Sequence, residues 1–538
     1  MRIKLVYPPQ LHSHNIQFYL LEPLFVPSIS LPVVFSFLKK KGYKVQQDDL
    51  DIKVHISKKK INLHIFDDKN RIRKFLQKGS DWELEEEAER ILKFTNLNGF
   101  DIVGFSIMDE WNFASIGTTI VMSKLIKEKT GAGIAVGGVG AAAFLRWFSE
   151  EDILKFIDIY CPRPSVGHLD FYDVLLSMER KSKIKEKTKV KIFKDTYNNP
   201  IKNVIVNTKL VENFFPFHEF DGTTVEDLVP IPDFDTLPLE LYKRIPEDIK
   251  KNRLGSKKIL VLPYYFMIGC PNQCIFCTTR MGNFIFKDPQ NVANDLEYLS
   301  RKYKTRFFIF FNPNVNPTRV IAEKFINAMK KKDLNLIWSD CANFARLDKK
   351  ILKGLRDIGA RRLILGVESP SPRMLKYIEK GTTISHIEKM LRLSDKLSIW
   401  NEIELISGLP HETKKDIQNT INFLRRNKRY INFVYLHKFK LHYSKLTENP
   451  EKYGITNLRP TNLSPGMGFD EINGLKWEEK AKEIEYSYEL IKSEIEKLPN
   501  FGYTGKDQHV IKLFYLYSIF DDKKEILEYL QSNPFEAM

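Results

Sequence analysis

The chain has 538 residues, of which 43% are apolar and 12% are aromatic. This composition is typical of a globular protein with two or three domains and excludes a disordered chain. The formal net charge of +16 indicates either an acidic partner, such as nucleic acid or anionic lipid, or lysines spread over solvated faces. Because the lysines form short scattered runs without an aromatic-interleaved stripe, we favour the second explanation and expect no nucleic-acid partner.

The sequence predicts a cytoplasmic protein without a membrane span. Residues 1–9 indicate a first β-strand that runs into a loop, with no secretory signal. The most apolar window, residues 20–38, contains one glutamate and three prolines, whereas a membrane span needs about 20 uninterrupted apolar residues. Five cysteines in the whole chain is a usage typical of reducing, intracellular compartments.

Residues 1–180 alternate strand-like and helix-like stretches. The strand-like runs are residues 3–7, 43–47, 101–107, 133–136 and 157–161. Amphipathic segments lie between them, and this βαβ rhythm predicts an α/β domain with a doubly wound parallel sheet of the flavodoxin or Rossmann type. A charged, helix-rich insertion at about residues 51–100 interrupts the sheet, and we assign it to packing.

Ligands of such sheets bind beyond the carboxyl ends of the strands. The loops at these ends begin near Tyr7, Ser106, Gly137 and Gly167. Gly137 and Gly138 directly follow an apolar strand, and glycines there allow the backbone to approach a ligand closely. Residues 181–255 then form a connection, in which residues 189–193 and 204–207 predict a hairpin and residues 230–238 a proline-stiffened linker.

Three of the five cysteines, Cys270, Cys274 and Cys277, fall within eight residues near the middle of the chain. Three thiolates on one short loop can hold three corners of a cubane iron–sulfur cluster. A zinc knuckle is the alternative, but no histidine and no fourth cysteine lies within 20 residues of the loop. Cys161 and Cys341 stand alone, so the chain lacks the thiolates for an auxiliary cluster.

From residue 257 the βα alternation restarts and predicts a partial (β/α)6 TIM-like barrel over residues 256–440. The expected strands are residues 258–263, 306–311, 334–339, 361–366, 402–406 and 432–437. The expected helices are residues 289–303, 317–331, 349–358, 370–379 and 412–426. We place Asp348 at the cap of the third helix. Catalytic groups of such barrels lie at the carboxyl ends of the strands.

Polar side chains follow several of these strands. Asn312 and Asn314 end the second strand, and Arg346 follows the third. Arg346 has two interpretations, a fork that pairs with a carboxylate or an ordinary surface arginine. Glu368 and Ser369 end the fourth strand, and a ligand role is favoured for Glu368 because a buried, unpaired carboxylate is costly.

Beyond residue 440 the βα rhythm stops. Residues 460–468 indicate a loop, residues 476–498 a charged amphipathic helix, and residues 514–520 an aromatic segment that packs under the barrel. We expect residues 441–538 to be mainly helical and to shape the substrate pocket, where Tyr503 and His509 are possible contributors.

The C-x3-C-x2-C loop resembles the signature loop of the radical SAM (S-adenosylmethionine) superfamily, in which SAM chelates the fourth iron. Together with the domain before it, the chain resembles the cobalamin-dependent subfamily. The matching segments are Pro27-Ser28 through Gly42 to Val45, Gly104-Phe105-Ser106, Gly137-Gly138, Gly366-Val367-Glu368-Ser369 and residues 408–413. His411 replaces a glycine of the last motif. Gly167 to Asp170 matches the family's G-E-G-E turn imperfectly, and no D-x-H-x-x-G supplies an axial histidine, which leaves His168 as a weak candidate.

The resemblance implies three cofactors and their sites. The cluster ligands of the 4Fe-4S centre are Cys270, Cys274 and Cys277. The residues implied for SAM are Phe276, Asn312, Asn314, Arg346, Glu368, Ser369 and Leu409. The residues implied for cobalamin are Ser106, Ile107, Met108, Gly137, Gly138 and Gly167.

The resemblance also implies an activity, a C-methyltransferase that acts on an unactivated carbon through a 5′-deoxyadenosyl radical. A radical cyclase or rearrangement enzyme of the same subfamily is the alternative. An iron–sulfur protein that only senses or transfers electrons is a second alternative. The expected partner is an electron donor such as a flavodoxin or a ferredoxin, beside a substrate that the sequence does not identify.

Overall fold

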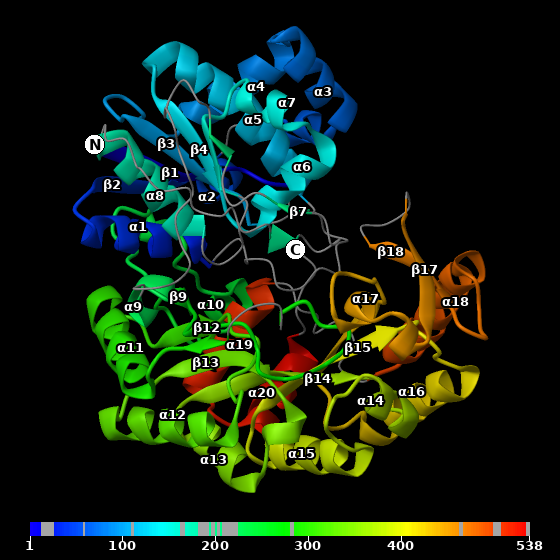
Figure 1. Cartoon of the computed structure of the whole chain (residues 1–538). Coiled ribbons are helices and arrows are strands. Elements are labelled where there is room, and N and C mark those ends of the chain that lie inside the picture. Colours follow the sequence, from blue (N-terminus) through cyan, green and yellow to red (C-terminus); the bar gives the residue numbers. More distant parts are fainter. Residues whose placement is uncertain are drawn as a thin grey trace. The chain divides into compact units, whose positions relative to one another are not determined.

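The computed structural model divides the chain into two compact units (Figure 1). Unit 1 comprises Met1–Asp195 with Asn199–Lys243, and unit 2 comprises Thr196–Asn198 with Arg244–Met538. The structure describes residues 1–11, 26–57, 60–108, 112–161, 167–180, 193–194, 200–201, 205–206, 224–279, 284–461, 466–498 and 507–533. Tyr503 and the side chain of His509, both possible substrate contacts, lie outside the described part.

Unit 1 contains a parallel sheet in the order β2-β1-β3-β4-β5, with β8 added at the edge next to β5. Only the β5–β8 pair is antiparallel. The strands are β1 (Arg2–Tyr7), β2 (Lys44–Asp49), β3 (Ile102–Ser106), β4 (Gly133–Gly137), β5 (Ile159–Cys161) and β8 (Ile205–Val206). This flavodoxin-like order reverses between β1 and β3, which is where ligands of such sheets bind. The predicted doubly wound sheet is therefore confirmed.

Helices cover both faces of this sheet (Figure 1). The helices are α1 (Ser30–Lys40), α2 (Leu50–Ile56), α3 (Lys69–Lys78), α4 (Trp82–Leu92), α5 (Phe113–Thr130), α6 (Phe144–Trp147), α7 (Glu150–Leu154), α8 (Gly167–Arg180) and α9 (Val225–Leu228), with short 3-10 turns at Leu63–Asp67, Val139–Ala143 and Leu239–Leu241.

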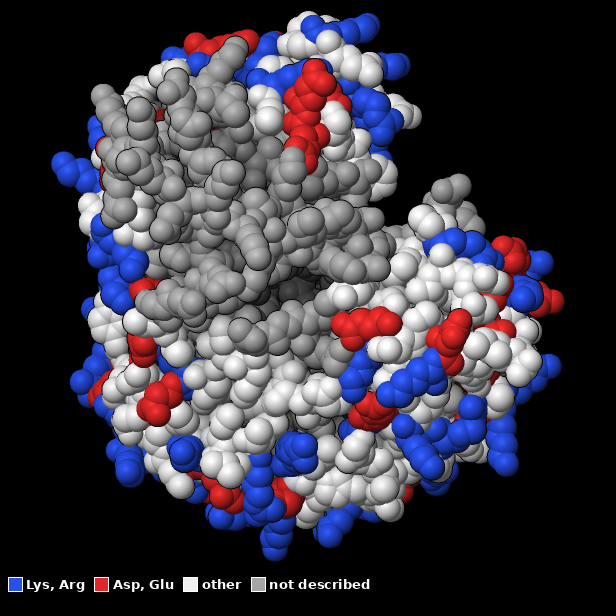
Figure 2. Space-filling view, viewed as in Figure 1, with Lys and Arg blue, Asp and Glu red and all other residues white. Residues whose placement is uncertain are grey.

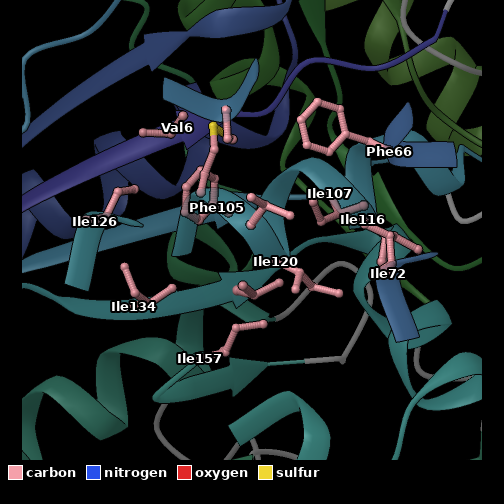
Figure 3. Close-up of a cluster of buried hydrophobic side chains, with 14 of the residues drawn as sticks. Val6, Phe66, Ile72, Phe105, Ile107, Ile116, Ile120, Ile126, Ile134 and Ile157 are labelled. Atoms are coloured by element: carbon pink, nitrogen blue, oxygen red, sulfur yellow. The ribbon is translucent and has the colours of Figure 1, made fainter. Parts of the chain in front are cut away.

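The insertion before β3 belongs to the core of unit 1, as its amphipathic pattern predicts. Phe66 and Ile72 from the insertion pack with Ile116 of α5 and with Phe105 of the sheet (Figure 3). Helix α5 and the insertion lie in close contact at Gly117. A Cβ on this glycine would lie only 2.2 Å from the Phe66 carbonyl oxygen. The insertion thus buries apolar area against the rest of unit 1.

The connection forms a smaller hairpin than predicted. Strand β6 (Phe193–Lys194) pairs in an antiparallel manner with β7 (Pro200–Ile201). The second expected hairpin strand, residues 204–207, contributes β8, which pairs instead with β5 of the main sheet. The remainder of the predicted first hairpin strand, residues 189–192, lies outside the described residues.

Unit 2 contains six parallel strands in the order β9-β12-β13-β14-β15-β16, which confirms the predicted six-unit architecture. The strands are β9 (Val261–Tyr264), β12 (Phe307–Phe310), β13 (Ile337–Ala342), β14 (Ala360–Glu368), β15 (Trp400–Ser407) and β16 (Phe433–Lys438). The helices between them are α11 (Pro289–Tyr303), α12 (Arg319–Lys332), α13 (Lys349–Asp357), α14 (Pro372–Tyr377), α15 (Ile384–Lys396) and α16 (Lys414–Asn427). Asp348 caps α13 as predicted, since its carboxylate accepts the Ile351 N–H.

A short antiparallel pair encloses the cysteine loop, with β10 (Met267–Ile268) before the loop and β11 (Ile285–Phe286) after it. Past the barrel come α17 (Lys445–Glu448), β17 (Ile455–Pro460), β18 (Met467–Glu471), α18 (Trp477–Ile495), α19 (Asp507–Ile519) and α20 (Lys523–Ser532), and α10 (Glu247–Lys251) precedes β9. The β17–β18 hairpin is a difference from the prediction, which expected a loop and helices here.

The aromatic segment of α19 packs at the amino end of the barrel, as predicted. The Phe514 ring stacks on Phe307, with centroids 6.4 Å apart. The Tyr515 hydroxyl donates to the carbonyl of Lys257, before β9, and the Tyr517 hydroxyl donates to that of Ser398, before β15. The opposite, carboxyl end of the strands is therefore left to the functional groups.

On the face shown in Figure 2, basic and acidic side chains of the described residues are interspersed. No helix among the described residues combines the length and the apolar character needed to cross a membrane.

Candidate functional site

The cysteine loop lies at the carboxyl end of β9, between β10 and β11. Two amides approach its first sulfur: Asn272 and Asn314 each point a side-chain N–H at Cys270 Sγ, at 3.3 and 3.4 Å. Amide donors of this kind stabilise negative charge on a sulfur atom. Asn314 comes from the loop after β12 and therefore joins two neighbouring strand ends.

The other two cysteines lie deeper. Burial raises the pKa of the Cys274 thiol to about 11, and burial also raises the pKa of Cys277. Nearby Lys380 opposes this effect on both thiols. Metal binding to such thiols releases their protons. Among the described residues no three Cys, His, Asp or Glu side chains converge on one metal ion; a cubane needs its thiolates further apart, because each thiolate binds a different iron.

A buried ion pair ends β14. Lys380 Nζ donates to Glu368 Oε1 at 2.6 Å, and each side chain is only 8% exposed. Glu368 adopts a left-handed backbone conformation with φ +62°, where the register between β14 and β15 shifts. The pair occupies the space above Gly366, because a Cβ there would lie 2.5 Å from Glu368 Oε1 and 2.7 Å from Lys380 Nζ. The first position of the Gly-Val-Glu-Ser sequence therefore requires glycine, since only glycine leaves room for this ion pair.

The asparagines after β12 have different surroundings. Asn312 is fully engaged by the protein: its amide donates to Asp340 Oδ2 at 2.8 Å and its oxygen accepts the Phe266 N–H at 2.9 Å. Burial raises the pKa of Asp340 to about 8, despite these hydrogen bonds. Asn314 is equally buried, but its Oδ1 has no hydrogen-bond partner among the described residues. A buried amide oxygen without a donor is costly, so Asn314 has the capacity to accept a bond from a ligand.

Ser369, beside Glu368, repeats this pattern. Its hydroxyl is 1% exposed and has no hydrogen-bond partner in the described part of the chain. The remaining predicted SAM residues are placed differently: Phe276 is half-buried, Arg346 is exposed at the end of a 3-10 turn (Phe344–Arg346), and Leu409 is completely buried. The unpartnered groups, Asn314 Oδ1 and Ser369 Oγ, therefore lie at the ends of β12 and β14.

Two groups inside the barrel have no counterpart in the sequence prediction. One is Lys380, the partner of Glu368, which a single sequence does not distinguish from a surface lysine after a short helix. The other is Glu404 of β15, which is half-buried and has no hydrogen-bond or ion-pair partner among the described residues. Burial and Glu368 raise the pKa of Glu404 to about 7, and Lys380 lowers it. Two residues earlier, Glu402 is paired with Arg362 at 2.6 Å and accepts the Tyr435 hydroxyl.

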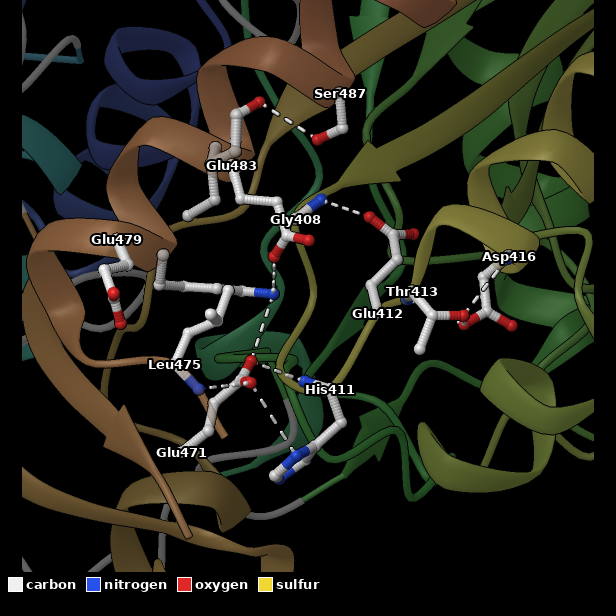
Figure 4. A network of polar contacts seen from close by, with 12 residues as sticks. Gly408, His411, Glu412, Thr413, Asp416, Glu471, Leu475, Glu479, Glu483 and Ser487 are labelled. Carbon is white, nitrogen blue, oxygen red and sulfur yellow. Dashed lines mark hydrogen bonds and ion pairs between the residues drawn. The ribbon is translucent and has the colours of Figure 1, made fainter. Parts of the chain in front are cut away.

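The turn after β15, residues 408–413, is held by polar contacts (Figure 4). Glu412 Oε2 accepts the Gly408 N–H at 2.6 Å, and burial raises the pKa of Glu412 to about 7. Thr413 and Asp416 then form a capping box that begins α16. His411 occupies the position of the family's glycine and keeps a positive φ of +59°.

At the carboxyl edge of the unit 1 sheet, the ends of β3, β4 and β5 present backbone and small side chains, while β2 ends at the buried Asp49. Ser106, Gly137 and Cys161 end β3, β4 and β5 in register. Ser106 Oγ lies 2.8 Å from Ser30 Oγ at the start of α1. Gly138 has φ +101°, and a Cβ there would lie 2.3 Å from the Ile107 carbonyl oxygen.

The other predicted cobalamin residues flank this edge. Ile107 is buried and Met108 is half-buried. Gly167 begins α8 and approaches Cys161 closely enough that an added Cβ would lie 3.4 Å from the Cys161 oxygen. His168 packs edge-on against Phe37, and its Nε2 lies 2.8 Å from the Asp227 carbonyl oxygen. Its ring nitrogen is thus engaged within the protein.

Comparison with known proteins identifies the class of unit 2. Residues 264–424 match the model of the radical SAM superfamily and form a radical SAM domain. The matched span contains Cys270, Cys274 and Cys277, together with Glu368 and the turn after β15.

The fold of the chain is similar to that of two solved radical SAM enzymes. The enzyme OxsB, solved with aqua-cobalamin and SAM, is similar with a TM-score of 0.56 at 16% identity, over 100% of this chain and 76% of OxsB. The methyltransferase TsrM from Kitasatospora setae, solved with cobalamin and a [4Fe-4S] cluster, gives a TM-score of 0.51 at 14% identity, over 87% of this chain and 78% of TsrM.

Sequence similarity to curated proteins is partial. The anaerobic magnesium-protoporphyrin IX monomethyl ester cyclase of Rubrivivax gelatinosus is 28% identical over 208 residues, which is 37% of this chain and 35% of the cyclase. The alignments with the first curated relatives span 42% and 35% of those proteins.

Proposed function

We propose that the protein is a cobalamin-dependent radical SAM enzyme that methylates an unactivated carbon. The observation that carries this proposal is Asn314, which donates to Cys270 Sγ with its nitrogen while its buried oxygen has no partner among the described residues. A side chain that touches a cluster ligand and still needs a donor suits SAM, whose amino group supplies N–H donors next to the cluster. Ser369 and Glu368 offer further polar contacts at the next-but-one strand end.

The residues of unit 2 fit a 4Fe-4S cluster with bound SAM. Three cysteines supply thiolates and leave one iron for an outside ligand. Lys380 supplies a buried positive charge close to Cys274 and to Glu368, which offsets part of the negative charge of the thiolates. When bound, the reduced cluster and SAM supply a 5′-deoxyadenosyl radical, and cobalamin supplies a transferable methyl group.

The residues of unit 1 fit a large ligand that is recognised by shape. The ends of β3 and β4 carry Ser106, Gly137 and Gly138, so this part of the sheet edge presents backbone and one hydroxyl. This edge lies at the point where the strand order reverses, the usual ligand position in such sheets. The fold of OxsB and TsrM, both solved with cobalamin, supports cobalamin as this ligand.

Product analysis tests the proposal. Protein reconstituted anaerobically with iron, sulfide and cobalamin is incubated with SAM and a reductant, and 5′-deoxyadenosine is quantified by mass spectrometry. We expect 5′-deoxyadenosine from the wild type and none above background from Cys274→Ala. Wild-type protein with a full cluster that yields no 5′-deoxyadenosine under any reducing condition contradicts the proposal.

A radical cyclase is the second candidate, and the similarity to the Rubrivivax cyclase favours it. The two activities differ in how they consume SAM. A methyltransferase of this type recharges cobalamin with the methyl group of SAM and releases S-adenosylhomocysteine beside 5′-deoxyadenosine, whereas a cyclase needs no methyl donor. We expect both products, and S-adenosylhomocysteine at background levels would favour the cyclase.

The chemistry calls for a source of single electrons, because reduction of the cluster precedes SAM cleavage. We propose a flavodoxin or a ferredoxin as this partner and the cytoplasm as the compartment. Replacement of a chemical reductant by a flavodoxin, its reductase and NADPH should support 5′-deoxyadenosine formation.

A further inference from the structure

We propose that β18 and α18 hold the turn after β15 in its ligand-binding shape, with His411, Glu471 and Lys480 as positioning residues. We call these three residues the turn clasp. The turn, residues 408–413, lies at the carboxyl edge of the barrel, where ligands of parallel barrels bind. The inference rests on the proposed function, because it takes SAM as the ligand of this edge.

The turn needs support because His411 has an unfavourable backbone conformation. Its φ is +59°, a region that glycine enters freely and that a residue with a Cβ enters at a cost of about 1–3 kcal/mol. Residues in this region persist only where their surroundings hold them there. The contacts of His411 therefore indicate what fixes the turn.

Every part of His411 is held by a neighbour. Its N–H donates to Glu471 Oε1 of β18 at 2.7 Å, and its carbonyl accepts from Arg373 Nη2 at 2.6 Å. Its ring packs edge-on against Tyr377, with centroids 5.8 Å apart. Gly454, just before β17, leaves space for the ring, because a Cβ there would lie 2.5 Å from His411 Nε2.

Lys480 of α18 supplies the charge that keeps Glu471 in place. Its side chain is completely buried, and its Nζ lies 3.0 Å from Glu471 Oε1 and 3.2 Å from Glu483 Oε2. Burial raises the pKa of Glu471, but Lys480 and the His411 N–H outweigh burial, so the pKa stays below its ordinary value. Burial raises the pKa of Glu412, the residue that accepts the Gly408 N–H, and Lys480 opposes this effect. Lys480 thus pairs with Glu471 and Glu483. Figure 4 shows these two carboxylates beside the turn.

Helix α18 also contacts the first residue of the turn directly. A Cβ on Gly408 would lie 2.2 Å from Ile484 Cγ1, so the helix packs against the bare backbone of the turn. The segment after the barrel is therefore a structural part of the barrel edge. Loss of the clasp should let His411 relax and change the turn, while the cluster loop on β9 stays intact.

The test measures SAM affinity on anaerobically reconstituted protein by equilibrium dialysis with labelled SAM. We expect Glu471→Gln to weaken SAM binding about tenfold, as about 1.4 kcal/mol of released strain implies, with the iron content unchanged. The decisive variant is H411G. Because glycine adopts φ +59° without support, E471Q in an H411G background should cost little or no affinity.

Glu494→Gln is the matched control. Glu494 of α18 pairs with Arg425 of α16 through two hydrogen bonds of 2.9 and 2.8 Å, and that pair does not touch the turn. E494Q should bind SAM like the wild type. If E471Q does not fold, His411→Ala tests the other support of the turn, because alanine keeps the strained φ and loses the ring contact with Tyr377; it should bind SAM more weakly than H411G.

The outcomes distinguish failure of the proposed function from failure of this inference. Wild-type protein with a full cluster that fails to bind SAM overturns the proposed function and, with it, this inference. Wild-type binding together with unchanged affinity in folded E471Q overturns the inference alone. A loss in E471Q that H411G does not restore also overturns it, since the clasp would then act on something other than His411.

Discussion

The two units each present the carboxyl edge of a parallel sheet, yet the two edges differ in chemistry. The ends of β3, β4 and β5 in unit 1 carry Ser106, Gly137 and Cys161, and none of these is charged. The carboxyl group of Asp49, at the end of β2, is buried and accepts the Tyr242 hydroxyl. The strand ends of unit 2 carry three cysteines and the buried Glu368–Lys380 pair. An edge of backbone and small groups recognises a ligand by shape, whereas buried charges recognise charge, such as that of SAM.

The comparison also predicts how each edge responds to substitution. At the carboxyl edge of the unit 1 sheet, an added side chain should destabilise the fold, because the backbone there already lies within contact distance of its neighbours. At the carboxyl edge of the unit 2 sheet, removal of a charge should destabilise the fold, because the charged side chains there are buried and paired.

The largest expected effect is loss of the cluster. Cys274→Ala should reduce bound iron and the visible absorbance of the reconstituted protein to background, since two thiolates remain on the loop. Cys341→Ala serves as the control, because Cys341 of β13 lies outside the loop, and its iron content should match the wild type. Equal losses in both variants would contradict the assignment of the cluster to residues 270–277.

The second-largest effect is expected from removal of one charge at the carboxyl edge of the unit 2 sheet. Glu368→Gln leaves Lys380 buried without its partner, so the free energy of unfolding should fall by about 3 kcal/mol. Urea unfolding measures this loss, and the double variant E368Q/K380M should recover part of it. A single variant as stable as the wild type would show that the pair is not buried as a unit.

Added volume at the first edge should have a smaller effect. Gly138→Ala places a Cβ 2.3 Å from the Ile107 oxygen at φ +101°, which should destabilise unit 1 by about 1–3 kcal/mol. Cobalamin retention through gel filtration should fall, while SAM binding to unit 2 should stay unchanged. Gly167→Ala, whose Cβ meets the Cys161 oxygen at an ordinary 3.4 Å, is the matched control. Equal effects of the two variants would rule out the steric explanation.

The smallest expected effect is a pH dependence from Asp340. Its folded pKa of about 8 lies above its ordinary value of 3.8, so the folded state binds more protons between these values and stability falls as the pH rises. Asp340→Asn removes this titration. The loss of unfolding free energy between pH 6 and pH 8 should be smaller in D340N by roughly 1–2 kcal/mol. Parallel curves for the two proteins would contradict the assignment.

The sequence predicts the framework better than the contacts within it. The cysteine spacing and the six strands of the barrel follow from local patterns, and so does the cap at Asp348. Helix α15 was not predicted, although Thr383 caps it and Ile387 and Leu391 lie on its buried face. The β17–β18 hairpin was also missed, and its pairing is irregular, with a register shift between Thr456 and Arg459.

The partners of the site residues could not be predicted, because they depend on tertiary structure. Lys380 follows Glu368 by 12 residues at the end of a short helix, and nothing in its local sequence marks it as buried. Asn312 and Asn314 look equivalent in the sequence, but Asp340 engages the first, whereas the side-chain oxygen of the second has no hydrogen-bond partner among the described residues. The role of His411 likewise depends on Glu471, which lies 60 residues further along the chain.

Titration of SAM against the reduced, reconstituted cluster, followed by electron paramagnetic resonance, tests the central claim most directly. If the barrel holds SAM beside Cys270, the cluster spectrum of the wild type should change on addition of SAM. Asn314→Leu should then need at least tenfold more SAM for the same change, because a buried donor on SAM loses its acceptor. A wild-type spectrum that stays unchanged at saturating SAM would contradict the account.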